Sequence, residues 1–147
     1  PDMAPMIFAK SIIKKQPINV FNFGNMQRDF TYIDDIVEGV YRCCYKPAYI
    51  DEKFDTLNPN NSSSFAPYRI FNIGNNQPIK LLKFIEILED CLGLKAIKNF
   101  QPMQPGDVEA TAANTDLLDS WIGFKPSTSI ELGVDKFSRW YLDYYKD

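Results

Sequence analysis

The sequence contains no histidine, and its only thiols belong to Cys43, Cys44 and Cys91. A histidine base is therefore excluded, and so are zinc sites of the usual kind, because the chain also lacks a C-x-x-C pair. An odd number of thiols without such a pair is typical of proteins in a reducing compartment. We therefore expect free cysteines, no metal site and a cytoplasmic location.

Glycine is also sparse, since the chain has 7 and no two of them lie within three residues of each other. A turn that brings the pyrophosphate of a dinucleotide against backbone N–H groups needs closely spaced glycines between a strand and a helix. The sequence offers no such turn, so we expect no cofactor-binding residues in it.

Long apolar runs and an excess of positive charge are missing as well. No stretch is long and apolar enough for a membrane span, and no secretory leader is recognisable. The net charge of −3 argues against a nucleic-acid partner, because a phosphate backbone requires a basic face. With 45% hydrophobic residues, the chain is typical of a globular protein with neither a membrane nor a nucleic acid as its partner.

The periodicity of the apolar residues predicts an α/β fold. We expect helices over 3–15, 34–46, 78–92, 115–122 and from 130 onward, and strands over 18–23, 69–73 and 96–100. The last helix follows a capping-box pattern, Thr128 to Glu131. Residues 49–67 are rich in turn formers, so we interpret them as a mobile surface insert.

The helix expected over 34–46 carries an apolar stripe at helical spacing. Its members are Ile36, Val37, Val40, Tyr41 and Cys44. We interpret this stripe as part of the hydrophobic core and not as a cofactor contact.

Arg28 is the residue of greatest functional interest, because it stands among apolar and polar neighbours where it needs an anionic partner. Its planar guanidinium suits a phosphate or a carboxylate, bidentately. Its partner could instead be internal, with Asp29, Asp34 or Asp35 as candidates. The residues alone leave both possibilities open and favour the internal pair.

Three ordered motifs resemble those of extended short-chain dehydrogenases/reductases that act on nucleotide sugars, the NAD-dependent epimerase/dehydratase family. They are Arg28-Asp29-Phe30 leading to Asp34, the strand motif Tyr68 to Asn75, and Met103 to Val108 with its Pro-Gly-Asp. The sequence of the third motif, Met103-Gln104-Pro105-Gly106-Asp107, is most similar to that of the UDP-glucuronate 4-epimerase branch. The resemblance implies that residues 1–147 are a C-terminal nucleotide-sugar-binding region whose N-terminal NAD-binding domain is absent.

The resemblance also implies a set of substrate-binding residues. In the family, the matching arginine grips the diphosphate, and the matching strand lies against the uracil. The set expected here is Arg28, Asp107, Phe21, Asn19, Val20, Met3, Asp2 and Gln104. Many members have arginine where this chain has Gln104, which leaves Arg28 as the one cation assigned to the diphosphate. The strand pattern alone does not decide whether Phe21 faces the base or the core.

No catalytic residue is expected in this chain. The family's catalytic tyrosine and lysine lie four residues apart on a helix of the N-terminal half, and the same spacing in Tyr49 and Lys53 falls inside the insert. By resemblance, the whole enzyme would bind NAD, oxidise C4 of UDP-glucuronate to a 4-keto sugar and return hydride to the other face. The product would be UDP-galacturonate, for polysaccharide synthesis.

The family pattern also implies that the helix over 34–46 and the strand over 69–73 dock onto the NAD-binding half. Without that half, the strand would expose an unpaired edge, so we expect the chain to be marginally stable or to self-associate. Two other hypotheses remain. The chain could belong to a nucleotide-sugar dehydratase or decarboxylase, or it could be a non-catalytic binding or assembly module that lost the reaction.

Overall fold

The computed structural model describes residues 3–145. Their contacts divide them into two compact units. The first unit contains residues 3–30, 77–112 and 128–145, and the second contains 31–76 and 113–127. The first unit contains both helices and strands, as the periodicity predicted, whereas the named elements of the second unit are helices.

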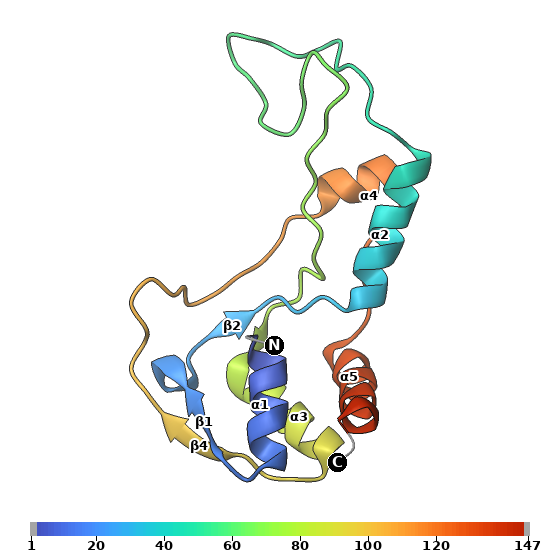
Figure 1. Ribbon diagram of the computed structural model, residues 1–147. Helices are drawn as coiled ribbons and strands as arrows, with labels where there is room; N and C mark the ends of the chain where they lie inside the picture. The colour runs from blue at the N-terminus through green and yellow to red at the C-terminus, as the bar shows by residue number, and fades with distance from the viewer. Residues whose placement is uncertain (1–2, 146–147) are drawn as a thin grey trace. The chain divides into compact units, whose positions relative to one another are not determined.

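The first unit holds most of the regular structure (Figure 1). Its elements are α1 (Ala4–Ile13), β1 (Pro17–Val20), the 3₁₀ turn η1 (Phe21–Gly24), β2 (Gln27–Arg28), β3 (Ile79–Lys80), α3 (Leu81–Leu92), β4 (Ile97–Phe100) and α5 (Ile130–Tyr144). β1 pairs with β4 in parallel, and β2 pairs with β3 in antiparallel orientation.

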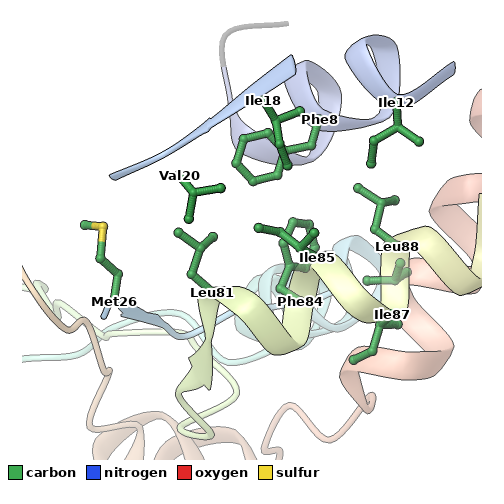
Figure 2. Close-up of a cluster of buried hydrophobic side chains, with 11 residues drawn as sticks. Phe8, Ile12, Ile18, Val20, Met26, Leu81, Phe84, Ile85, Ile87 and Leu88 are labelled. Atoms are coloured by element: carbon green, nitrogen blue, oxygen red, sulfur yellow. The ribbon is translucent and has the colours of Figure 1, made fainter. Parts of the chain in front are cut away.

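Helix α3 forms the centre of the core of this unit. Its residues Phe84, Ile85 and Leu88 are at most 1% exposed. Figure 2 shows them pointing toward side chains of α1 and β1, including Ile12 and Ile18. Burying one such side chain contributes about 1.5–3 kcal/mol to folding, so the face of α3 accounts for much of the stability of this unit.

The strand expected over 18–23 ends earlier, at Val20. Asn22 and Phe23 adopt left-handed backbone angles, with φ of 48° and 51°, and the chain turns there into η1. Gly24 completes the turn with φ of 85°, and a Cβ at this position would lie 2.8 Å from Cγ of Leu82. The turn therefore needs glycine at residue 24 for both its backbone conformation and its contact with α3.

A carboxylate of α3 with two lysine partners stabilises the connection between α3 and β4. Glu89 is 4% exposed, and its side chain accepts hydrogen bonds from Lys95 at 3.0 Å, from the backbone N–H of Ala96 at 3.0 Å and from Lys98. Burial alone would raise the pKa of Glu89, but these hydrogen bonds hold the pKa below its usual value.

The second unit contains α2 (Ile33–Tyr45) and α4 (Asp116–Ile122). Arg42 joins them, since it pairs with Glu38 at 2.6 Å, donates to the carbonyl of Gly123 at 3.1 Å and lies over the ring of Phe124. Gly39 is buried in α2, and a Cβ there would lie 2.5 Å from Cδ1 of Ile73. A glycine in mid-helix thus allows the segment around Ile73 to lie directly against α2.

Two expectations for this unit are wrong. Residues 69–73 form no strand; they make one isolated bridge, between Ser63 and Arg69, and Ile70 is 50% exposed. The apolar stripe of α2 is not a core face either, because Val37 and Val40 are 57% and 58% exposed. Both differences have the same physical reason. A strand needs a neighbouring strand as its hydrogen-bond partner, and an apolar helix face needs a covering surface. The described part of this unit supplies neither.

Two smaller corrections concern element boundaries. Helix α3 begins at Leu81, because Ile79 and Lys80 pair with β2 before the helix starts. The N-cap of α5 is Ser129, whose hydroxyl accepts from the N–H of Leu132, and not the first residue of the expected capping box. Residues 49–67 contain turns but no helix or strand, and their mobility stays a prediction.

The Glu89 cluster makes a prediction about acid stability. We expect Glu89→Gln to lower the free energy of unfolding at pH 7 by about 1–3 kcal/mol, because it removes charge-assisted hydrogen bonds from a buried acceptor. The folded-state pKa is depressed, so this stabilisation is present above the unfolded pKa of about 4.3 and is lost as pH falls through the folded pKa. Urea unfolding at pH 7 and pH 3 measures both effects.

The matched control is Glu86→Gln, which removes an exposed carboxylate of the same helix, 3.5 Å from Lys83. We expect it to change stability by less than about 0.5 kcal/mol at either pH. Equal losses for the two variants would contradict the role given to Glu89.

Candidate nucleotide-sugar site

The candidate site is built around Arg28, which β2 positions in the first unit. β2 is short, and its two residues pair with Ile79 and Lys80 immediately before α3 begins. The N–H of Leu81 donates to the carbonyl of Met26 at 2.8 Å, which ties the start of α3 to the residues just before Arg28. The backbone of Arg28 is therefore held by the same helix that organises the core.

The guanidinium of Arg28 has defined partners. Nη2 donates to Oδ1 of Asp107 at 2.7 Å, and Nη1 donates to the carbonyls of Gln27 at 2.8 Å and Glu109 at 3.3 Å. The side chains of Arg28 and Asp107 are 27% and 31% exposed. Two residues expected in the same site from separate motifs are thus in direct contact.

These contacts leave part of the guanidinium uncommitted. Arginine has five N–H donors in a planar arrangement, and three of them have the acceptors just named. The N–H of Nε and one N–H of Nη2 have no hydrogen-bond acceptor among residues 3–145. Both project from a side chain that is partly open to solvent, so an anionic ligand can be bound without breaking the pair with Asp107.

The segment carrying Asp107 runs alongside the segment carrying Arg28. Gln101 starts this run, donating its N–H to the carbonyl of Val20 and accepting from the N–H of Phe23, both at 3.0 Å. The run continues where the N–H of Gln27 donates to the carbonyl of Glu109 at 2.8 Å. Residues 20–28 and 101–109 therefore form one continuous frame within the first unit.

Three expected residues lie at the start of this frame, on β1 and η1. Asn19 accepts from Nδ2 of Asn99 at 3.0 Å, and the side chain of Val20 is fully buried. Phe21 is half-buried and packs against the core cluster. Val20 thus contributes only backbone to this frame, while Phe21 has core contacts and also some exposed ring surface.

The remaining expected residues are less closely tied to Arg28. Gln104 is exposed, and its carbonyl accepts from the N–H of Asp107 at 3.2 Å, which shapes the loop. Met3 is 73% exposed at the start of α1, and among residues 3–145 no hydrogen bond or ion pair joins it to the Arg28 frame. Asp2 lies outside the described residues.

Two contributors were not anticipated from the sequence. Glu109 accepts from Arg28 through its backbone carbonyl, and the hydroxyl of Thr111 accepts from the N–H of Asp29 at 3.2 Å. A carbonyl is present at every residue, so no sequence signal distinguishes Glu109. Thr111 lies outside the motifs that carry the resemblance, and only the folded chain brings it beside Asp29.

The described residues contain no group of three or more histidine, cysteine, aspartate or glutamate side chains placed to hold a metal ion. No helix within 3–145 has the length and apolar character needed to cross a membrane. Cys43, Cys44 and Cys91 are free thiols.

The fold and the motifs of this chain are similar to those of extended short-chain dehydrogenases/reductases that act on nucleotide sugars. The UDP-glucuronic acid 4-epimerase of Bacillus cereus, solved with UDP-glucuronic acid and NAD, matches 99% of this chain with a TM-score of 0.78 and 26% identity. The match covers 41% of that protein. The extent of this match is consistent with the expectation of a C-terminal half.

Sequence relatives are of the same kind. The chain is 51% identical over 146 residues to Protein CapI of Staphylococcus aureus and 43% identical over 152 residues to the probable UDP-glucuronate 4-epimerase of Rhizobium meliloti. It covers 44% and 43% of their lengths, so it spans less than half of either relative. No protein-family model matches the chain. Its homologues and structural neighbours are nonetheless UDP-glucuronate 4-epimerases and related NAD-dependent epimerases and dehydratases.

The ion pair between Arg28 and Asp107 makes a testable prediction about stability. We expect a double-mutant cycle of Arg28→Ala and Asp107→Ala to give a coupling free energy of about 0.2–1 kcal/mol, because both side chains are partly exposed to solvent. Urea unfolding of the four proteins measures the coupling. A coupling free energy above about 2 kcal/mol would mean that Asp107 serves mainly as the internal partner of Arg28 and that the pair stabilises the fold.

Proposed function

We propose that this chain is the nucleotide-sugar-binding part of an NAD-dependent 4-epimerase that interconverts UDP-glucuronate and UDP-galacturonate. The single observation that carries the proposal is the Arg28 guanidinium, held in place by Asp107 and two carbonyls yet retaining unengaged N–H donors. The similarity to UDP-glucuronate 4-epimerases supports the choice of sugar nucleotide.

The proposed role of Arg28 is to hold the diphosphate. A 4-epimerase must release the sugar ring to turn within the site while the rest of the substrate stays bound. Charge-assisted hydrogen bonds of about 1.5–3 kcal/mol each are suited to this task. Asp107 orients the guanidinium through the bond at 2.7 Å and prevents it from swinging into solvent. In this proposal, Asp107 keeps the free N–H donors of Arg28 directed toward the diphosphate. Residue 104 is glutamine and supplies no second cation.

The hydride chemistry is assigned to a part of the enzyme that this chain does not contain. NAD accompanies the substrate in the solved Bacillus cereus protein. The present chain has no closely spaced glycines and no tyrosine–lysine pair in the family's place, so we propose that NAD is bound by another region. The chain alone would then bind substrate but catalyse no reaction.

We further propose that the exposed face of α2 docks onto that NAD-binding region. Ile33, Val37, Val40 and Tyr41 recur at helical spacing, and each is between 56% and 60% exposed. An apolar stripe of this kind ordinarily packs against another element. A surface on the remaining part of the enzyme, more than half of the length of the relatives, is the occupant we propose.

The UDP-galacturonate formed would supply polysaccharide synthesis, and we place the enzyme in the cytoplasm, in agreement with its free thiols. Self-association remains a prediction. An open strand edge at residues 69–73 does not support it, because that strand is absent, and the exposed face of α2 provides the better reason to expect it.

The role of Arg28 is tested by titrating the chain with UDP-glucuronate in a calorimeter. We expect saturable binding, and we expect Arg28→Ala to weaken it by about tenfold or more, because one charged hydrogen bond contributes that much. Arg139→Ala is the matched control, since it removes an exposed arginine on α5 of the same unit and should leave affinity unchanged. Equal affinity of Arg28→Ala and the unsubstituted chain would refute the diphosphate role.

The role of Phe21 is tested with UDP, which carries the base and the diphosphate but no sugar. If the exposed part of the ring contacts the uracil, Phe21→Leu should weaken UDP binding severalfold. The free energy of unfolding should fall by less than about 1.5 kcal/mol, because the half-buried side chain stays apolar and loses only part of its buried area. Loss of stability with unchanged UDP affinity would assign Phe21 to the core alone.

A further inference from the structure

A groove between α1 and α5 in the first unit lies among residues that the nucleotide-sugar site does not use. Its volume is about 530 Å³. One wall includes Lys10 and Ser11 of α1 and its C-cap residue Lys14, and the other includes Tyr141 of α5 and its C-cap residue Tyr145. This volume is within the range of small-molecule sites, about 300–1,000 Å³. Both helices pack on α3, so the groove is formed by the most firmly structured part of the chain (Figure 1).

One wall of the groove is basic. Lys10 lies in the last turn of α1, Lys14 is the C-cap residue four positions further on, and no aspartate or glutamate lines the groove. Neither lysine has an ion-pair partner among residues 3–145. Within the described residues the two ammonium groups thus form a positive wall without an ion-pair partner, unlike Arg28, whose charge Asp107 partly balances.

The carbonyls at the end of α1 do not bind these ammonium groups. The last carbonyls of a helix ordinarily attract nearby lysines. Here the carbonyls of Lys10, Ser11 and Ile12 accept from the backbone N–H groups of Lys14, Gln16 and Lys15, at 3.0, 2.8 and 3.0 Å. Because the backbone satisfies these carbonyls, both lysine side chains remain available for a ligand.

The opposite wall is aromatic. The rings of Tyr141 and Tyr145 are 4.7 Å apart, and Tyr145 also lies edge-on to Trp140 at 6.3 Å. Tyr141 is 6% exposed, and burial raises its pKa, so its hydroxyl stays protonated and can donate a hydrogen bond. The wall is therefore held by neighbouring rings and offers an aromatic surface.

From these two walls we infer that the groove between α1 and α5 binds an aromatic anion, a planar ring that carries a phosphate or carboxylate group. The ring would pack on Tyr145, and the anionic group would lie between Lys10 and Lys14. This site is separate in its residues from the Arg28 frame and does not depend on the function proposed above.

The test uses phenyl phosphate, which has the ring and the phosphate but no ribose, observed by saturation-transfer NMR with the 147-residue chain. We expect saturable binding with a dissociation constant of about 1 mM or lower, as two charged hydrogen bonds allow. The double variant Lys10→Ala, Lys14→Ala should weaken binding about tenfold or more. Both lysines are exposed, so circular dichroism should show an intact fold.

Matched variants separate this groove from other sites. Lys83→Ala with Lys136→Ala removes two exposed lysines that do not line the groove and should leave binding unchanged. Arg28→Ala should also leave it unchanged. Tyr145→Ala should reduce the affinity for phenyl phosphate to that for inorganic phosphate. The inference is overturned if phenyl phosphate does not saturate, if Arg28→Ala abolishes binding, or if the Lys10 and Lys14 variant binds as well as the unsubstituted chain.

Discussion

The burial of one face of α3 is the constraint on which the first unit depends. Phe84, Ile85 and Leu88 fill the space beneath α1 and β1, and Phe84 also stacks on Phe30 at 4.6 Å. The first residue of the same helix binds the carbonyl of Met26 through its backbone N–H. Packing of α3 therefore fixes both the core and the strand that presents Arg28, which couples the candidate site directly to the stability of the fold.

The two units differ in how much of the apolar face of their main helix is buried. In the first unit, one face of α3 is buried against α1 and β1, and the buried Glu89 has three hydrogen-bond donors. In the second, α2 packs on α4 and on Ile73 but leaves an apolar stripe in solvent. A helix with this pattern is complete only when another surface covers it. The difference agrees with a chain that spans less than half of its Staphylococcus aureus and Rhizobium meliloti relatives.

The first unit contains two basic features whose chemistry is different. Arg28 is balanced by Asp107 and oriented by backbone carbonyls, so it suits one ligand group in one geometry. Lys10 and Lys14 are exposed, lack an acidic neighbour among the groove residues and line the groove together with tyrosine rings. Such a wall attracts an anion with less geometric demand. A chain of negative net charge can therefore carry the two anion sites proposed here, because an anion site depends on the local arrangement of charges and not on the total charge.

The sequence by itself determined what depends on local pattern. The helical periodicity predicted α1, α2, α3 and α5 within a few residues, and the ordered motifs around Arg28 and Asp107 indicated the kind of enzymes to which the chain is similar. Only the tertiary structure decided which partners these residues have. It paired Arg28 with Asp107, left residues 69–73 without a strand, exposed the stripe of α2 and assembled the groove from α1 and α5. The reason is that these outcomes depend on contacts between residues far apart in the chain, which periodicity and spacing do not encode.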